Sequence, residues 1–276
     1  MKARAHLVDS AGLPYLWDCP AKCDANPRPT CQTAGMGSTG TKPGTKRRRG
    51  RLGPAFRLAV AILKPFLTIF TRHEWRGTEN LAGDHGLVLA SNHLSWFDPL
   101  VISHVLWEND RPPRFLAKDS LFTVPFVGWV LKDTGQIPVV RGTRDAALSV
   151  QAAVDAARRG ECVVVYPEGT ITKDPQMWPA RAKSGAARIA LTAGVPLVPM
   201  AQWGAQEVMG PYRKEFKILP RKTMHVLVGP PVNLDDLRGR ELTAEVLSIA
   251  SQRLMDAITD LLRDLRGTTQ TERGAA

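Results

Sequence analysis

Short apolar runs alternate with stretches of helical period from Glu74 onward, a pattern typical of an α/β layer architecture. The apolar runs predict strands at 86–91, 113–117, 136–140, 162–166, 196–202 and 223–229. The helical stretches predict helices at 99–107, 145–159, 180–193 and 243–265. Gly160 and Gly194 suit the left-handed residue that ends a helix, and Thr243 suits the N-cap of the last helix. The predicted fold is therefore α/β: a single domain with a mixed, mostly parallel sheet flanked by helices.

An apolar segment at 53–72 precedes this predicted domain and directly follows the basic run Lys46 to Arg51. A membrane-spanning helix needs about 20 largely uncharged residues, whereas this segment contains Arg57, Lys64 and Pro65. We therefore expect a helix that lies in a membrane interface, with the neighbouring cations among anionic head groups. A core helix preceded by a solvated run of charge is the alternative.

The net charge of +11 over 276 residues is unevenly distributed. Residues 1–52 hold ten Lys/Arg and three Asp/Glu, which leaves 27 and 23 for the remaining chain. Because most of the basic charge belongs to this segment, a nucleic-acid-binding core is not indicated. Residues 1–52 are rich in Pro, Gly, Thr and Lys and have no apolar period, so we expect a disordered basic tail there. We also expect a disordered C-terminus at 268–276.

The cysteines do not indicate a metal site. Cys19, Cys23 and Cys31 lie in the predicted tail, at spacings that match no standard zinc pattern. Cys162 opens an apolar strand and is expected to be a small buried residue. The chain has neither a GxGxxG turn after a strand nor a GxxxxGK[ST] loop, so no nucleotide cofactor is expected.

A histidine and an aspartate separated by four residues follow an apolar run, in the segment Asn92-His93-Leu94-Ser95-Trp96-Phe97-Asp98-Pro99. Pro99 suits the first residue of a helix, so Asp98 is predicted to be the N-cap of the helix that follows. Across such a strand-to-helix turn, Asp98 can accept a hydrogen bond from His93 and make the imidazole a better base for a hydroxyl proton. A structural histidine beside a capping aspartate is the alternative.

Three further segments follow in order along the chain. They are Gly135-Gln136-Ile137-Pro138-Val139-Val140-Arg141, Tyr166-Pro167-Glu168-Gly169-Thr170 and Val195-Pro196-Leu197-Val198-Pro199. With the segment around His93, they resemble the four ordered motifs of the glycerolipid acyltransferase family, especially the 1-acylglycerol-3-phosphate acyltransferases. Lys118 and the segment Lys183-Ser184-Gly185-Ala186-Ala187 also look like features of this family. The resemblance covers roughly residues 75–235, and we place the acyltransferase α/β domain at 73–267.

The resemblance implies transfer of a fatty acyl group from an acyl thioester to the free hydroxyl of 1-acylglycerol-3-phosphate, which gives phosphatidate. The donor would be acyl-CoA or acyl carrier protein, the acceptor lysophosphatidate, and no metal or other cofactor would be needed. His93 would be the general base and Asp98 its orienting partner. Because no GxSxG nucleophile elbow is present, we expect direct attack by the acceptor alcohol, without a nucleophilic role for Ser95. Trp96 and Phe97 would either line an acyl groove or fill the core.

The resemblance also suggests which residues bind substrate. Lys118 and Arg141 are candidates for the acceptor phosphate, because a dianion needs cationic partners. Glu168 is expected to hydrogen-bond the free hydroxyl of the acceptor or to hold Arg141 in place. Gly169 and Thr170 are expected beside the ligand, which the missing side chain of Gly169 allows to approach closely. A lipid substrate further favours peripheral attachment at the cytoplasmic face of the cell membrane.

Two positions depart from the family pattern. Val140 stands where an aspartate usually precedes Arg141, and Ile171 stands where an arginine often follows Thr170. Lys173, two residues further on, is the candidate replacement for that arginine. These departures leave another lysophospholipid or a glycolipid open as the acceptor. A membrane-associated acyl hydrolase that uses the same His/Asp pair on water, and a membrane-bound scaffold with an inactive site, are the remaining alternatives.

Overall fold

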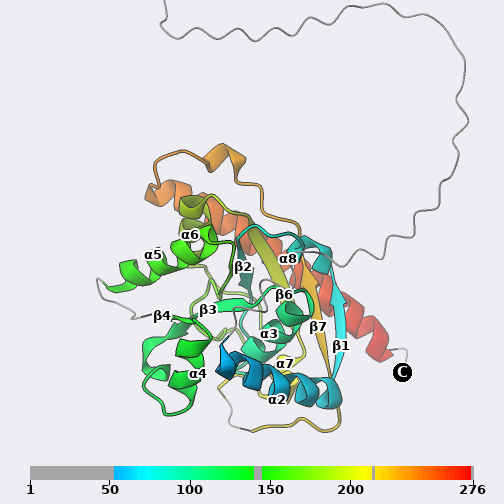
Figure 1. Cartoon of the computed structure of the whole chain (residues 1–276). Helices are drawn as coiled ribbons and strands as arrows, with labels where there is room; N and C mark the ends of the chain where they lie inside the picture. Colours follow the sequence, from blue (N-terminus) through cyan, green and yellow to red (C-terminus); the bar gives the residue numbers. More distant parts are fainter. Residues whose placement is uncertain (1–52, 140–144, 213–214, 275–276) are drawn as a thin grey trace, which may run out of the picture. The chain divides into compact units, whose positions relative to one another are not determined.

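The structure, a computed structural model, describes residues 53–139, 145–212 and 215–274 (Figure 1). A seven-stranded sheet is its centre. In spatial order the strands are β1 (Thr71–Arg76), β7 (Lys222–Val228), β6 (Leu197–Trp203), β2 (Leu87–Ser91), β5 (Cys162–Val165), β3 (Pro113–Lys118) and β4 (Ile137–Val139). Within the described residues β6 and β7 are the one antiparallel pair, and the other neighbours run parallel. The predicted mixed, mostly parallel sheet is confirmed.

Helices cover both faces of this sheet (Figure 1). The α-helices are α2 (Pro54–Phe70), α3 (Asp98–Glu108), α4 (Val127–Asp133), α5 (Asp145–Arg158), α6 (Gly185–Ala193), α7 (Ala205–Val208) and α8 (Ala244–Gly274). The 3₁₀ turns are η1 (Thr78–Leu81), η2 (Asp119–Leu121) and η3 (Asp235–Leu237). One core cluster joins the sheet to α5, α6 and α8, and the other joins it to α2, α3 and α7.

Strand β2 shows why the apolar runs predicted the sheet. All five of its residues are buried, with Val88 and Ala90 in one core cluster and Leu87 and Leu89 in the other. A parallel strand that is covered on both faces is apolar at every position, without the alternation of a half-exposed strand. The Cys162 side chain is also buried, as predicted, and opens β5.

Several elements differ from the predicted ones. β1 was not predicted, because Thr71–Arg76 contains no apolar run and carries Arg72, Glu74 and Arg76. α4 was not predicted either, because it is a single short apolar stretch of seven residues. α6 begins at Gly185 rather than at residue 180, and α8 continues to Gly274. The prediction of a disordered C-terminus from residue 268 is therefore wrong for 268–274, which are helical.

The predicted ends of two helices are confirmed. Gly194 has φ 72° directly after α6, and Gly160 has φ 86° after α5. The Thr243 hydroxyl accepts a hydrogen bond from the Val246 amide at the start of α8, as expected of an N-cap.

The N-terminal apolar segment forms the 17-residue helix α2, which buries Ala55, Phe56 and Leu67. Among the described residues, no helix combines the length and the apolar character needed to cross a membrane. The interfacial position of α2 stays a prediction. The predicted tail at 1–52, with its three cysteines and the Lys46 to Arg51 run, lies outside the described residues.

Candidate active site

The segment Asn92–Pro99 leaves the carboxyl end of the central strand β2 and leads into α3. In open α/β sheets, ligands bind beyond the carboxyl ends of the strands. Asn92 is buried, and its Nδ2 donates to the backbone oxygen of Gln202 at 3.0 Å. Gln202 in β6 returns two bonds, from its backbone nitrogen to Asn92 Oδ1 (2.9 Å) and from Nε2 to the Asn92 backbone oxygen (3.1 Å). The start of the turn is therefore held firmly to the sheet.

His93 and Asp98 meet across this turn. His93 Nδ1 donates to Asp98 Oδ2 at 2.8 Å, and the same oxygen accepts the backbone N–H groups of Leu94 (2.6 Å) and Ser95 (2.9 Å). The Asp98 side chain has no exposed surface, whereas 12% of the His93 side chain is exposed. Because Nδ1 faces Asp98, Nε2 is the ring nitrogen available to a substrate proton.

Asp98 does not cap α3, so the N-cap prediction is wrong by one residue. Phe97 occupies the N-cap position without a side-chain cap, and Asp98 is the first helical residue. Its carboxylate points back into the turn, to the backbone of Leu94 and Ser95. Burial raises the pKa of Asp98, and the hydrogen bonds from His93, Ser95 and Leu94 act in the opposite direction.

The plane of the His93 ring is set by Tyr166. The two rings stack with their centroids 4.0 Å apart and their planes 16° apart. Tyr166 follows the carboxyl end of β5, which pairs with β2 through Ala90 and Val165. Burial holds the pKa of Tyr166 far above its ordinary value, so this ring stays neutral. The sequence marked Tyr166 only as the first residue of a motif and not as a site residue.

Ser95 and the two aromatic residues beside it have separate roles. Ser95 is buried, and its hydroxyl donates to the Met209 backbone oxygen at 2.7 Å and accepts the Phe97 amide at 3.0 Å. These contacts agree with the expectation that Ser95 is not a nucleophile. Phe97 is buried in the core, whereas Trp96 is 61% exposed and lines a groove. Of the two alternatives for this pair, Trp96 therefore lines a groove and Phe97 fills the core.

The groove beside His93 has a volume of about 840 Å³. Most of its wall is apolar and comes from α2, α3, β3 and α4, including Phe56, Ala59, Leu63, Leu100, Phe115 and Leu131. Of the predicted binding residues, Lys118, Gly169 and Thr170 line it together with His93. An apolar groove with a few polar groups at one place is the usual form of a small-molecule site.

The Glu168 carboxylate accepts two backbone amides. The side chain is buried and is not among the groove-lining residues. Its Oε1 accepts the His93 backbone amide at 3.3 Å, and its Oε2 accepts the Ala180 amide at 2.9 Å. Burial also raises the pKa of Glu168. Glu168 therefore positions the backbone of His93, and its expected contact with the substrate hydroxyl stays a prediction. Arg141, the residue that Glu168 was expected to hold, lies outside the described residues.

Lys183 is a groove residue that the sequence did not identify as a binding candidate. Gly169 has φ 72°, and a Cβ atom added to it would lie 3.0 Å from Lys183 Nζ. The ammonium group therefore lies over Gly169 and lines the groove with His93. Lys173 instead lines a neighbouring hollow of about 740 Å³, with Tyr212 on the boundary of both. Lys173 is thus not part of the groove wall.

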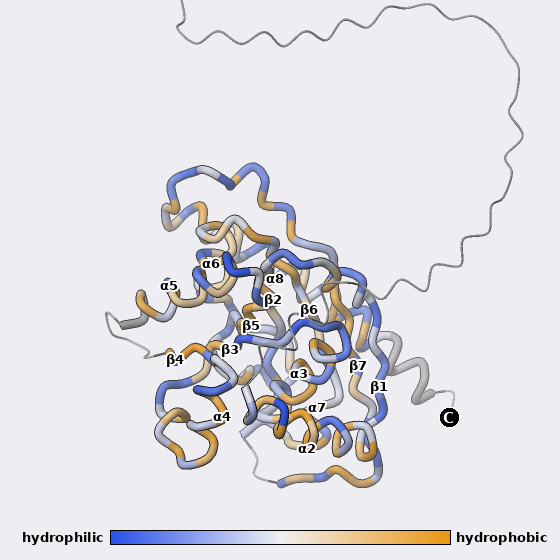
Figure 2. The backbone as a smooth tube through the Cα atoms, in the orientation of Figure 1, coloured by the Kyte–Doolittle hydropathy of each residue, from blue (hydrophilic) through white to orange (hydrophobic). Residues whose placement is uncertain are grey.

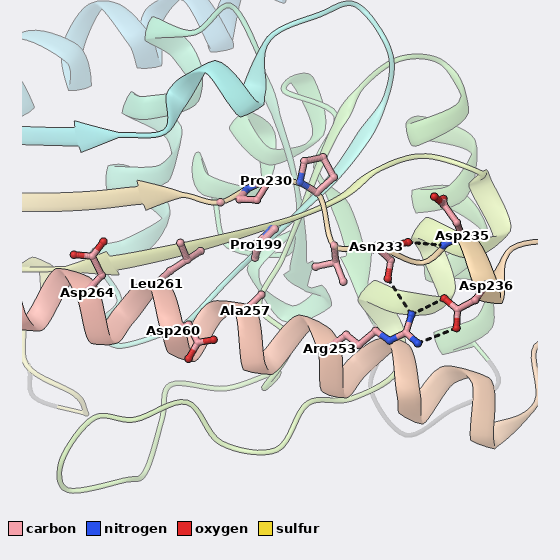
Figure 3. A pocket seen from close by; sticks show the side chains of 13 residues that line it. Pro199, Pro230, Asn233, Asp235, Asp236, Arg253, Ala257, Asp260, Leu261 and Asp264 are labelled. Atoms are coloured by element: carbon pink, nitrogen blue, oxygen red, sulfur yellow. Dashed lines mark hydrogen bonds and ion pairs between the residues drawn. The ribbon is translucent and has the colours of Figure 1, made fainter.

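A third hollow, of about 930 Å³, lies between α8 and the segments around Pro199 and Pro230 (Figure 3). Its lining carries the carboxylates of Asp235, Asp236, Asp260 and Asp264, and Arg253 binds Asp236 through both guanidinium ends. None of the predicted site residues lines it. The groove at His93 is therefore the candidate active site.

Comparison with known proteins gives matches over the region that contains this site. A family model described as Acyltransferase matches residues 72–203. A 1-acyl-sn-glycerol-3-phosphate acyltransferase of Chlamydomonas reinhardtii is 32% identical over 193 residues, which cover 68% of this chain and 56% of that protein. The protein of the same name from Bacillus subtilis is 26% identical over 73% of this chain and 96% of its own length.

The coverage of the relatives is uneven. The chain spans 56% and 46% of the relatives from Chlamydomonas and Brassica napus, about half of their length. Among solved structures, the 1-acyl-sn-glycerophosphate (LPA) acyltransferase PlsC of Thermotoga maritima aligns with a TM-score of 0.59 and 21% identity, over 80% of this chain and 83% of that one. That likeness supports the fold alone.

Proposed function

The chain belongs to the acyltransferase family through residues 72–203, and on this basis we propose that it transfers a fatty acyl group from an acyl thioester to 1-acylglycerol-3-phosphate. The product is phosphatidate, and the donor is acyl-CoA or acyl carrier protein. The observation that carries the proposal is the 2.8 Å bond from His93 to buried Asp98 at an apolar groove of about 840 Å³.

In the proposed reaction, His93 Nε2 takes the proton of the acceptor hydroxyl while that oxygen attacks the thioester carbonyl carbon. The carbon–sulfur bond then breaks, and the thiolate leaves with the proton that His93 returns. Asp98 stabilises the imidazolium that forms between these steps, as the orienting carboxylate does in serine hydrolases. No acyl-enzyme forms, and the two hydrogen bonds of Ser95 agree with this route.

The acceptor phosphate in this proposal is bound by cations at the groove. Lys118 ends β3 and lines the groove, and Lys183 lies over Gly169 on the wall that contains His93. Lys64 also lines the groove but pairs with Glu108 at 2.8 Å. Lys118 and Lys183 are therefore the two ammonium groups that we assign to the phosphate head of a lipid at this mainly apolar wall. Arg141 remains a predicted third partner.

The proposal includes peripheral attachment to the cytoplasmic face of the cell membrane. α2 contributes Phe56, Ala59 and Leu63 to the groove and exposes Leu58 and Ile62 elsewhere on its surface. A helix with one face on a substrate groove and another apolar face exposed suits a bilayer interface.

A second acceptor class is supported by one observation. Ile171, which replaces the family's usual arginine, is buried, and Lys173 faces a different hollow. Neither position 171 nor position 173 therefore adds a cation to the described groove wall, which favours another lysophospholipid or a glycolipid as the alternative acceptor.

The test is a product assay with purified full-length protein, acyl-CoA or acyl carrier protein thioester, and a panel of lysolipids. We expect phosphatidate from lysophosphatidate at the highest kcat/KM in the panel. Equal rates with a neutral monoacylglycerol would contradict phosphate recognition. Free fatty acid released without any acceptor would instead show a hydrolase.

A further inference from the structure

Exposed apolar side chains gather on one part of the described molecule. Thirteen large hydrophobic residues are exposed, and five of them lie within nine residues of the chain: Leu121, Val124, Phe126, Val127 and Trp129. The most exposed of the five, Phe126, is 65% exposed, and its ring lies 6.0 Å from that of Trp129. Phe126 and Trp129 are not among the groove-lining residues, so the groove does not explain their character. Contiguous exposed apolar surface of this kind marks an interaction site.

The sequence of this region has no charge to offset its apolar surface. Residues 119–133, here called the α4 segment, comprise η2, a turn and α4. From residue 120 to residue 131 there is no Asp, Glu, Lys or Arg, and charged residues occur only at its two ends. A soluble loop exposed over such a length normally carries polar side chains, so this segment suits an apolar environment.

The α4 segment is attached to the beginning of α2. The Asp133 carboxylate accepts the backbone N–H groups of Ala55 at 3.0 Å and of Phe56 at 3.3 Å. Both are donors that a helix N-terminus leaves unsatisfied, so the end of α4 acts as the cap of α2. The two helices pack side by side, and Figure 2 shows hydrophobic positions, in orange, along both of them.

The exposed face of α2 continues this surface. Leu58, Ile62 and Ile69 follow the spacing of one helix face and are exposed by 46%, 56% and 60%. The α4 segment also reaches the groove, because Leu121 is both exposed and groove-lining, as is Trp96. The apolar surface therefore adjoins the mouth of the groove.

Residues 18–51, directly before α2, suit an anionic bilayer better than a protein cover for this surface. Residues 18–51 contain no Val, Ile, Leu, Phe, Tyr or Trp, so they offer almost no apolar side chains to bury it. Five cations instead stand between Lys46 and Arg51, directly before α2. Basic residues beside an apolar surface complement anionic head groups over hydrocarbon.

We propose that the α4 segment is a second membrane-binding element, which inserts Phe126 and Trp129 into the interface of an anionic bilayer beside α2. The groove then opens at the bilayer surface, where a lysolipid acceptor resides; this consequence rests on the proposed function, whereas membrane binding itself does not. Aromatic side chains are the residues that membrane interfaces favour.

The test is flotation of the full-length protein with vesicles of phosphatidylglycerol and phosphatidylcholine. The double variant Phe126→Asp/Trp129→Asp should bind about tenfold or more weakly than wild type, because two apolar side chains no longer enter the interface. Leu148→Asp is the matched control: Leu148 is 68% exposed on α5, which packs on the other face of the sheet, and its replacement should leave binding unchanged.

A milder double variant, Phe126→Ala/Trp129→Ala, should also weaken binding. It tests the proposal even if the aspartate variant misfolds. Unaltered vesicle binding by both double variants would overturn the proposal. A second result would also overturn it: normal vesicle binding by the variants, combined with a lower melting temperature or an altered oligomeric state in the absence of vesicles. The surface would then be covered by the chain itself or by a second copy. Flotation does not depend on turnover, so failure of acyl transfer in the product assay leaves this result interpretable.

Discussion

Two of the hollows in the described part of the protein have similar volumes, about 840 Å³ beside His93 and about 930 Å³ beside α8, but their linings differ in kind. The groove has a long apolar wall and a histidine held by a buried carboxylate. The hollow beside α8 is lined by exposed aspartates, one of which is paired with Arg253 (Figure 3). The volume of a hollow therefore does not identify the active site. A buried, hydrogen-bonded pair of titratable residues at an apolar wall identifies it.

The largest expected effect is the loss of activity when His93, in the groove, is replaced. Replacing His93 by Ala removes the base that takes the hydroxyl proton and should lower kcat by about 10² to 10⁴. The free energy of unfolding should change little, because Asp98 keeps its bonds to Leu94 and Ser95. Steady-state kinetics and a thermal melt measure both effects.

Arg253→Ala is the matched control in the other hollow, where it removes an exposed ion pair. It should leave kcat within about twofold of wild type, because exposed ion pairs contribute little. A large loss of activity in Arg253→Ala, or near-normal activity in His93→Ala, would reverse the assignment of the two hollows.

The next largest effect separates Lys183 from Lys173. Lys183→Ala should raise the acceptor KM about 10- to 150-fold, the loss expected for one charge-assisted contact, and leave the donor KM nearly unchanged. Lys173→Ala should have no such effect, because Lys173 lines a different hollow. Initial rates at varied lysophosphatidate concentration measure both. An acceptor-side loss confined to Lys173→Ala would mean that the third-motif position, and not Lys183, binds the head group.

Acidification should act on the wall of the groove. Burial lowers the pKa of His104 to about 4, with a further decrease from His73, while Glu108 opposes the shift. The folded state therefore binds fewer protons than the unfolded state below pH 6.5, and stability decreases as the pH falls from 6.5 towards 4. From the difference in pKa, His104 should cost on the order of 2 kcal/mol at pH 5.

Chemical denaturation of wild type and His104→Gln at pH 7 and pH 5 measures this cost. The groups that face His104 are His73, Trp75, Glu108 and Lys64, and they remain in the variant. The loss of stability between the two pH values should be smaller in His104→Gln. An equal loss in both proteins would show that His104 does not titrate in this range.

The smallest effect comes from filling each hollow with a bulky side chain. Ala59 on α2 lines the groove and Ala257 on α8 lines the acidic hollow, and both are partly buried. Ala59→Phe should lower kcat/KM about fivefold for long acyl chains, because one extra ring displaces a few methylenes of the bound chain. Ala257→Phe should not. A loss with Ala257→Phe alone would place the acyl chain beside α8.

The predictable part of the fold was its buried part. Runs such as Val163 to Val165 are apolar at every position because helices cover the sheet on both sides, and six strands could be predicted from them. β1 could not, because it forms an edge of the sheet and its exposed positions carry charge. α4 could not be predicted either. It is an exposed apolar helix of seven residues without a polar face, so its sequence does not show the helical period of apolar and polar positions.

The predictable part of the site was its local part. His93 and Asp98 are five residues apart, so one turn can join them, and the sequence showed both. Tyr166 and Lys183 reach the same place from distant segments, which only the folded sheet brings together. The partners of Glu168 are backbone amides, which every residue carries and no sequence pattern reveals.

A crystal structure with a non-hydrolysable thioether analogue of acyl-CoA tests most directly whether the groove is the site of acyl transfer. We expect the acyl chain along the wall formed by α2, α3 and α4, with the carbon that replaces the thioester carbonyl next to His93. The same density in the His93→Ala protein would show that binding does not need the base. An acyl chain in the hollow beside α8, with no density in the groove, would contradict the assignment.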